Sequence, residues 1–521
     1  MDIASLERAR TELQRRCDEQ RTQMERNRMG QFATPFLLAR EITIESLGYL
    51  GPNEPLDFLD PAFGTGAFYS ALLNEFPDRV ASSIGFEIDN HYGAPSVELW
   101  KGTNLQLHIA DFTNVQTDKG MVNLLICNPP YVRHHHLSAA VKAKLQRDCK
   151  SIGITLSGLA GLYCYFMVLA HRWLRPNAVS AWLVPSEFMG VNYGEAIKDY
   201  LLRNVTLLRI HRFDPQEVQF DDALVSSAVV WFRNRKPTKE TQVNLSFGGT
   251  LARPRRSAMF SIDELWREPK WTRLLHREVR GATEDSVRLG DLFSIKRGLA
   301  TGDNKFFILT EQQVADLGIS RKFLKPILPS PRYLKRDEIE ADEHGDPIVS
   351  PKLFLIDCPL DERELENADP ALADYLKSGA RTTANGYLCR SRTIWYSQEH
   401  RPPSPILCTY MGREGTEGKP AFRFILNHSQ ATAANVYLLL YPKPAVRHLL
   451  EGADTRQQVF QILRSIPMQH MTGEGRVYGG GLHKLEPREL ANVPLPEIAN
   501  LLPNRPLKGS QGSLGDEFLL R

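Results

Sequence analysis

The order of apolar and polar stretches predicts a sheet wound with helices in the first half of the chain. Short apolar runs alternate there with longer stretches of mixed polarity, and each run has the length of a strand. The runs span residues 56–59, 83–87, 105–109, 122–127, 179–184, 207–211 and 226–232. Strands that alternate with helical stretches are typical of an α/β fold with a largely parallel sheet. We therefore expect a mostly parallel seven-stranded sheet.

The segments outside this pattern predict the domain boundaries. Residues 4–28 mix Arg, Glu and Gln with few apolar side chains, a polar helical pattern that Gly30 could end, so residues 1–29 are expected to form a solvated lead-in helix. Residues 233–254 turn to Lys, Arg, Thr, Asn and Gly, which is typical of a boundary region. The predicted sheet domain is thus 30–245.

Residues 246–521 differ in texture from the first half. Proline and glycine interrupt this part more often, and candidate strands occur at 306–309, 422–426 and 436–440. A second domain of mixed α/β structure is therefore expected.

Composition narrows the class of protein. A chain of 521 residues suits two or three domains, and 42% hydrophobic with 24% charged residues is ordinary for a globular protein. The net charge of +3 neither requires nor excludes a polyanionic partner, so any nucleic-acid argument has to be local. Apolar stretches such as Leu159–Leu169 are too short to cross a bilayer and the N-terminus is not signal-like, so we expect a cytoplasmic protein without membrane contact.

The cysteines argue against a disulfide framework and against a zinc cluster. There are seven, an odd number, and no CxxC pair occurs among them. Three adjacent histidines, 134–136, cannot all face one metal ion, and we interpret them as part of a solvated or DNA-facing loop. No metal is expected.

Three predicted strands end in residues suited to a nucleotide-like cofactor. The first runs into Asp60-Pro61-Ala62-Phe63-Gly64-Thr65-Gly66, where glycines let the backbone approach a ligand. The second ends at Glu87, whose carboxylate can accept hydrogen bonds from ribose hydroxyls. The third leads to Asp111 beside Phe112, which offers an acceptor next to an aromatic face. The glycine pattern is not GxGxxG, so a dinucleotide is not expected.

The fourth predicted strand, 122–127, runs directly into Asn128-Pro129-Pro130-Tyr131. Two prolines fix φ and remove two backbone donors, which leaves a stiff segment rich in acceptors. The Asn128 side-chain oxygen and the Pro129 carbonyl could each take one hydrogen of a planar ring amine and favour a tetrahedral nitrogen, while Tyr131 could stack on the ring. The alternative is a plain strand-ending turn, which the order of the upstream motifs disfavours.

In this order, the motifs resemble the gamma class of N6-adenine DNA methyltransferases, the TaqI-like and Eco57I-type modification methylases. The resemblance adds Thr34-Pro35 and the stretch Phe220–Phe232. It implies a Rossmann-like catalytic domain dependent on S-adenosylmethionine, with S-adenosylhomocysteine as product, followed by a target-recognition domain. The implied reaction moves a methyl group to N6 of an adenine flipped out of double-stranded DNA.

The resemblance also implies roles for single residues. It implies that Glu87 binds the ribose of the cofactor, that Asp111 accepts from the adenine amine and that Phe112 packs near the adenine ring. Asn128 borders the same site. It also implies that residues before and after the first strand line the site of the methionine portion: Thr34, Pro35, Asp60, Pro61, Ala62, Gly64 and Gly66.

A second group of residues is implied to bind the target base. By the same resemblance Asn128 and Pro129 hold its amine, and Tyr131 and Phe220 contact its face.

The second half resembles the specificity domains of these enzymes at residues 289–306 and 478–496. Lys296, Arg297 and Arg133 are candidate phosphate contacts, with plain surface charge as the alternative. The recognition sequence cannot be carried over, because it depends on loop side chains.

Other functions compete with this hypothesis. Asn-Pro-Pro-Tyr also occurs in enzymes that resemble glutamine methyltransferases of release factors and guanine-N2 rRNA methyltransferases. The long second half favours DNA over RNA or protein, and the complete motif set disfavours a non-catalytic recognition subunit. Since residues 1–29 are too few for a nuclease domain, a cognate restriction endonuclease would be a separate protein.

Overall fold

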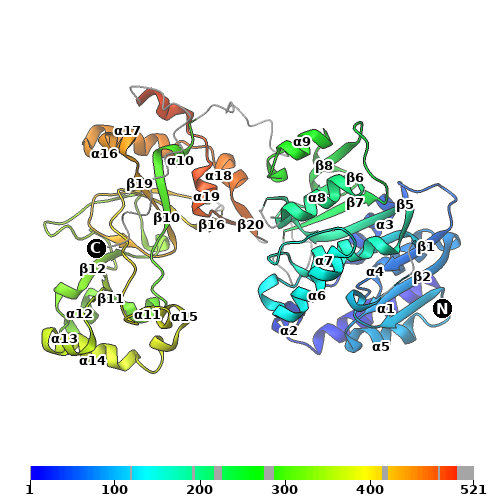
Figure 1. The fold of residues 1–521 in the computed structure, drawn as a ribbon, viewed down its shortest axis with the longest axis horizontal. Helices are drawn as coiled ribbons and strands as arrows, with labels where there is room; N and C mark the ends of the chain where they lie inside the picture. The colour runs from blue at the N-terminus through cyan, green and yellow to red at the C-terminus, as the bar shows by residue number, and fades with distance from the viewer. Residues whose placement is uncertain are drawn as a thin grey trace. The chain divides into compact units, whose positions relative to one another are not determined.

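The computed structural model describes residues 2–115, 117, 120–190, 194–215, 226–274, 287–413, 420–478 and 481–501. The chain divides into two compact units, and each is described by itself. The first comprises residues 1–279 with 476–482, and the second comprises 280–475 with 483–521. Figure 1 labels the elements of both.

The first unit contains a nine-stranded sheet in the order β3-β2-β1-β4-β5-β7-β6-β8-β9. Strands β1 to β5 run parallel, β7 is antiparallel to both of its neighbours, and β6 pairs in parallel with β8. All seven predicted strands are confirmed: β1 (Leu56–Asp60), β2 (Val80–Glu87), β3 (Leu105–Ile109), β4 (Val122–Cys127), β5 (Leu174–Pro185), β6 (Thr206–Arg212) and β7 (Ser227–Arg233).

The sheet extends further than the sequence predicted. Residues 233–254 are not simply a boundary, because β8 (Gln242–Gly249) and β9 (Pro254–Ser261) pair antiparallel and continue the sheet beyond β6. The first unit accordingly reaches residue 279 rather than 245. Val243 and Leu245 of β8 are fully buried, whereas most residues of β9 are exposed. The many polar residues of this hairpin are the reason why the sequence pattern did not predict its two strands.

Helices cover both faces of the sheet (Figure 1). Leu124 and Ile126 of β4 pack in the same core as α3 (Phe36–Leu47) and α4 (Ala67–Glu75). The alternate residues Leu125 and Cys127 pack on the other side, in the core that holds α6 (Ala139–Lys150), α7 (Leu162–Leu169) and α8 (Glu195–Arg203). Burial on both faces explains why every residue of β4 except Asn123 is apolar. The remaining helices of the unit are α1 (Ile3–Glu19), α2 (Gln23–Met29), α5 (Asn90–Leu99) and α9 (Ile262–Arg267).

The N-terminal helix α1 is part of the first unit, not a solvated lead-in. It contacts α4 and α5, and Leu13 and Cys17 are buried. Arg10, only 4% exposed, donates from Nη1 to Thr65 Oγ1 at 3.1 Å, and Thr65 Oγ1 donates to Gln14 Oε1 at 2.8 Å. The prediction of solvation was wrong because this contact is largely polar. The single helical stretch predicted before Gly30 is divided into α1 and α2, and it is α2 that ends at Gly30, which has a φ of 67°.

The second unit is a mixed α/β structure, as the sequence predicted. It is built on two sheets. One has the order β10-β19-β15-β17-β13, and the other β11-β14-β12-β18. Their strands are β10 (Phe293–Arg297), β11 (Ile308–Thr310), β12 (Leu324–Leu328), β13 (Glu338–Ile339), β14 (Leu353–Ile356), β15 (Ile406–Thr409), β17 (Phe424–Asn427), β18 (Thr432–Ala433) and β19 (Tyr437–Pro442). Three short strands complete the chain: β16 (Met411–Arg413), β20 (Arg476–Tyr478) and β21 (Leu482–Lys484).

Ten short helices accompany these strands in the described part of the unit. They are α10 (Leu289–Leu292), α11 (Asn304–Phe307), α12 (Glu311–Leu317), α13 (Glu362–Ala368), α14 (Pro370–Gly379), α15 (Tyr387–Arg390), α16 (Arg447–Glu451), α17 (Ala453–Arg464), α18 (Met468–Glu474) and α19 (Pro487–Ala491).

Two of the three strands predicted in this half are confirmed, as β17 and β19. The third, 306–309, was placed too early. Asp303 accepts hydrogen bonds from the backbone N–H of Lys305 and Phe306, which caps α11, so the strand β11 begins only at Ile308. Across the described residues of both units, the helices are too short or too polar to cross a membrane.

Candidate active site

A cavity of about 600 Å³ lies in the first unit at the carboxyl ends of β1 to β4. Its walls include residues that come within two positions of the ends of these four strands: Pro61, Ile88, Asp111 and Asn128. The carboxyl ends of parallel strands are where open α/β sheets hold ligands. A further wall comes from α1, from the end of α2 and from the turn after it, residues 30–33, and no sequence pattern indicated this contribution.

Glu87 fixes the glycine turn at the edge of the cavity. Its Oε2 accepts from the Gly64 N–H and its Oε1 from the Asp89 N–H, both at 2.8 Å. Burial raises the pKa of the Glu87 carboxyl, which is only 9% exposed. Each carboxylate oxygen can accept more than one hydrogen bond, so Glu87 keeps capacity for ligand hydroxyls. Gly64 has a φ of 56°, which favours glycine at this turn.

Asp60 supports the same turn from the interior. It is 1% exposed and is not among the residues that line the cavity. Its Oδ1 accepts from the Ala62 N–H at 3.1 Å, and burial raises its pKa to about 7. Pro61, Ala62 and Gly64 line the cavity, whereas Gly66 starts α4, with a φ of 90°. The structure therefore gives Asp60 a role in holding the turn.

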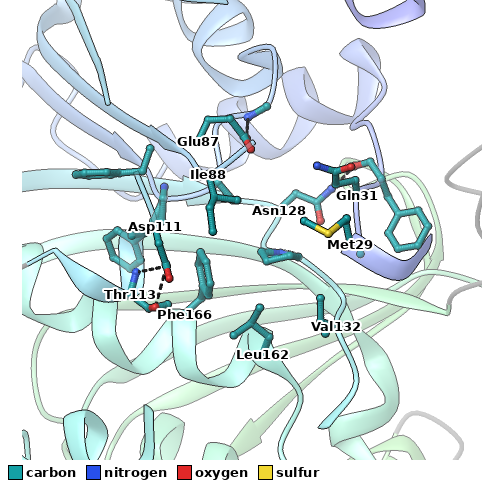
Figure 2. A pocket seen from close by; sticks show the side chains of 18 of the residues that line it. Met29, Gln31, Glu87, Ile88, Asp111, Thr113, Asn128, Val132, Leu162 and Phe166 are labelled. Carbon is teal, nitrogen blue, oxygen red and sulfur yellow. Dashed lines mark hydrogen bonds between the residues drawn. The ribbon is translucent and has the colours of Figure 1, made fainter. Parts of the chain in front are cut away.

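Asp111 projects into the cavity beside apolar side chains. Its Oδ1 accepts from the backbone N–H and the hydroxyl of Thr113, at 2.9 and 2.8 Å. Figure 2 shows Ile88, Asp111 and Phe166 facing the same space. Phe112 lines this region too, although it is 3% exposed, and its ring packs against Phe166 at 5.5 Å.

Sequence reasoning missed Ile88 and Phe166. Ile88 is 60% exposed although it directly follows a buried strand, and Phe166 comes from α7, far along the chain. The one available sequence signal was a β-branched apolar residue directly after Glu87, the acidic end of a predicted strand. The two side chains add apolar surface to the cavity wall near Asp111 (Figure 2).

The amide of Asn128 is held in one orientation. Its Nδ2 donates to the Phe32 carbonyl at 2.9 Å and to Thr34 Oγ1 at 3.1 Å. A carbonyl only accepts, so the Phe32 contact identifies the nitrogen side of the amide. The Oδ1 is buried and receives no hydrogen bond from the residues that the structure describes, and Asn128 lines the cavity. A strong acceptor is thus left unsatisfied at the cavity wall.

Thr34 and Pro35, two residues predicted to border the cofactor, lie outside the cavity lining. Thr34 is 8% exposed and orients Asn128 through its hydroxyl. Pro35 caps the start of α3. The structure therefore connects Thr34 with the Asn128 amide.

The remainder of the Asn-Pro-Pro-Tyr segment is anchored from two sides. Pro129 is buried and Pro130 lines the cavity. The Tyr131 N–H donates to the Gly30 carbonyl at 3.1 Å, and its hydroxyl donates to the Leu183 carbonyl at 3.1 Å. Burial raises the pKa of the Tyr131 phenol well above its usual value, so the phenol stays neutral. The Tyr131 ring also packs against that of Phe32, with 5.4 Å between centroids, and stacking on a base stays a prediction.

Gly30 joins the N-terminal segment to this corner. A Cβ at this position would lie 2.5 Å from the Tyr131 backbone nitrogen, and the residue has a φ of 67°. Both the close approach and the backbone conformation call for glycine.

The other predicted contacts are scattered. Phe220 lies outside the described residues, and Arg133 is exposed at the start of the 134–136 helical turn. Lys296 and Arg297 belong to β10 of the second unit and are exposed. The Arg297 guanidinium lies 4.0 Å from the centroid of the Tyr410 ring and donates from Nε to the Asn435 carbonyl, so part of its capacity is already used.

One carboxylate and histidine group in the second unit has the composition of a metal site. The ligand atoms of Glu338, Glu340 and His428 lie within 4.8 Å of one another. His428 Nε2 pairs with Glu338 at 3.0 Å, and Arg456 Nη1 lies 3.4 Å from His428 Nδ1. Both ring nitrogens therefore have protein partners, and we assign no metal to this group.

Two family models match the chain, one in each half. The model of the Eco57I restriction-modification methylase matches residues 78–219, and the model of the C-terminal domain of the type II methyltransferase M.Eco57I matches residues 270–511. Their positions follow the two units of the structure.

Similar proteins align over most of the chain. The type II methyltransferase M.AccI of Acinetobacter calcoaceticus is 26% identical over 481 residues, which cover 89% of this chain and 85% of the relative. M.XamI of Xanthomonas campestris pv. amaranthicola is 27% identical over 464 residues, with 86% and 82% covered.

The fold also matches a solved structure, the type IIL restriction-modification enzyme MmeI in complex with DNA, with a TM-score of 0.52 and 12% identity. The match covers 88% of this chain and 64% of MmeI, so the chain spans less than two thirds of that enzyme. This likeness supports the fold alone. Because models of both halves match and the aligned relatives run nearly end to end, the chain belongs to the Eco57I-type restriction-modification methylase family.

Proposed function

We propose that the protein is a site-specific DNA methyltransferase that moves a methyl group from S-adenosylmethionine to N6 of an adenine flipped out of duplex DNA. Membership of a restriction-modification methylase family supports DNA as the substrate. The observation that carries the choice of an amino group is the Asn128 amide, whose nitrogen is fixed by two acceptors and whose oxygen is unsatisfied at the cavity wall.

The cavity residues suit S-adenosylmethionine, which supplies an activated methyl group. Glu87 has free acceptor capacity for the ribose hydroxyls. The Asp111 carboxylate is placed to accept from the adenine amine, between the apolar side chains of Ile88 and Phe166 that would pack on the two faces of the ring. No metal takes part in the proposed reaction.

The chemistry assigned to Asn128 and Pro129 follows from the poor nucleophilicity of a ring amine. The lone pair of adenine N6 is delocalised into the ring, so the amine has to become tetrahedral before it can attack a methyl carbon. Asn128 Oδ1 accepts a hydrogen bond from one N–H of the amine and the Pro129 carbonyl accepts one from the other N–H, which stabilises the tetrahedral geometry. Since Phe32 and Thr34 hold the amide in place, the acceptor needs no reorganisation during the reaction.

The two units have different roles in this proposal, catalysis and target recognition. The first unit, with the α1 and α2 helices as a wall of its cavity, is the catalytic domain. The second unit recognises the target sequence in double-stranded DNA. Candidate phosphate contacts are Lys296 in the second unit and Arg133 in the first. We place the enzyme in the cytosol, as the modification partner of a separately encoded endonuclease.

The test uses purified protein, S-adenosylmethionine labelled in the methyl group and unmethylated plasmid DNA, followed by nucleoside mass spectrometry. The expected product is N6-methyladenine, and Asn128→Ala should reduce the rate by about 100- to 1,000-fold, the range found when one oriented hydrogen-bond donor is removed from an oxyanion hole. Asn123→Ala, at a residue of β4 whose amide holds Glu54 and Pro55, serves as the matched control. Labelled cytosine, RNA or protein in place of adenine would overturn the proposal.

A further inference from the structure

An exposed turn in the second unit combines an aromatic side chain with unpaired positive charge. The turn spans residues 380–392 and is called the arginine-tyrosine turn below. Tyr387, the first residue of α15, is 87% exposed, the highest value among the large apolar and aromatic side chains that the structure describes. Leu388 beside it is 38% exposed. The Tyr387 ring is therefore accessible to a partner.

The exposure of Tyr387 does not come from a loose backbone. Thr383 is 8% exposed and donates from its hydroxyl to Asp303 Oδ2 at 2.8 Å. Cys389 is fully buried in the core that holds Phe307. The Arg392 side chain turns inward and donates to the Ala300 carbonyl at 3.0 Å. Buried groups on both sides of Tyr387 thus hold the turn in place.

The charge of the arginine-tyrosine turn is of one sign. Residues 380–398 include Arg381, Arg390 and Arg392 but contain no Asp or Glu. Arg381 and Arg390 are exposed, and within the described chain their side chains have neither an ion pair nor a hydrogen bond. In contrast, Lys377 on the neighbouring helix α14 pairs with Glu366 at 2.9 Å and Asp374 at 3.3 Å. Two cations are thus left available next to an exposed ring.

We infer that the arginine-tyrosine turn is a contact surface for the target DNA, an inference that rests on the proposed function. Arg381 and Arg390 bind backbone phosphates, and Tyr387 stacks on a base exposed where the duplex is opened or unstacked. DNA that is locally opened offers this combination, because its backbone carries closely spaced negative charge and its unstacked bases present flat faces. The absence of acidic residues from the turn favours a polyanion over a protein partner of mixed charge.

The charge part of the inference is tested by filter binding of an unmethylated plasmid fragment to the full chain at a series of salt concentrations. Each lost phosphate contact reduces the slope of log K against log salt by about 0.9. The double variant Arg381→Gln/Arg390→Gln should therefore have a slope smaller by about 1.8, whereas Lys377→Gln, whose charge is already paired, should match the wild type. A double variant with an unchanged slope overturns the inference.

The aromatic part is tested by the kcat/KM for plasmid methylation. Tyr387→Ala should reduce it by about 5- to 150-fold through a raised KM, the range expected for loss of one base-stacking contact. Tyr387→Phe should keep it, because the ring remains. Since the ring is exposed, both variants should unfold at the wild-type temperature. If Tyr387→Ala methylates like the wild type, the inference is wrong even though the proposed function stands. If the wild type methylates no DNA, the proposed function itself fails.

Discussion

Replacing Thr34 with valine tests what orients the Asn128 amide. Valine has the shape of threonine but lacks the hydroxyl that accepts one amide hydrogen at 3.1 Å. A buried N–H without an acceptor costs about 1–3 kcal/mol. The amide would then be held only through the Phe32 carbonyl, so it would turn more freely and its oxygen would be aimed at the cavity less of the time. We therefore expect kcat to fall by about 10- to 100-fold, at about 1.4 kcal/mol for each factor of ten.

The assay separates this role from a contact with the cofactor. Single-turnover methylation of plasmid DNA gives the rate of the chemical step, and calorimetry gives the Kd of S-adenosylmethionine. Because Thr34 does not line the cavity, Thr34→Val should leave that Kd nearly unchanged, and Thr34→Ser should restore the rate. The family resemblance alone places Thr34 at the methionine portion and implies a raised Kd instead. A variant with a wild-type rate, or with a defect confined to cofactor affinity, would refute the reasoning.

Three further predictions follow from the same site. Ile88→Ala should raise the Kd of S-adenosylmethionine about tenfold in calorimetry, since burying an exposed isoleucine side chain under a ligand contributes roughly 1.5 kcal/mol; an unchanged Kd would remove Ile88 from the adenine site. Burial raises the pKa of Asp60 from its ordinary 3.8 to about 7, so the folded state holds this proton more tightly and wild-type stability should fall as pH rises from about 4 to about 7. Asp60→Asn should lack this loss, so thermal unfolding should show the variant gaining on the wild type over that range, and parallel curves would contradict the assignment. Gly30→Ala should lower the unfolding temperature and the methylation rate together, because its Cβ would lie 2.5 Å from the Tyr131 nitrogen at a positive φ, and wild-type values for both would argue against a strained contact.

The sheet could be predicted from the sequence where its strands are buried on both faces. The strand β4 is fully buried and is apolar except for Asn123, and β7 is buried apart from its last residue and is apolar between Ser227 and Arg233. The strand β9 could not be recognised in this way, because most of its side chains are exposed and several are charged. The domain boundary was placed too early for that reason.

The cavity could be predicted only in part. Glu87, Asp111 and Asn128 were found because each lies at or just after the end of a predicted strand, and the carboxyl ends of parallel strands meet at one edge. The α1 wall was missed because it meets the glycine turn through Arg10 and Gln14, and polar contacts leave no hydrophobic periodicity. The Asn128 and Thr34 hydrogen bond joins residues 94 positions apart, a distance that no local pattern spans.

The most direct test of the account is single-molecule sequencing of DNA from a methylation-deficient host that expresses either the wild type or Asn128→Ala. The account predicts N6-methyladenine within one short sequence context for the wild type and its loss for the variant. Unmodified DNA from the wild type, methylated cytosine, or equal modification by both proteins would contradict it.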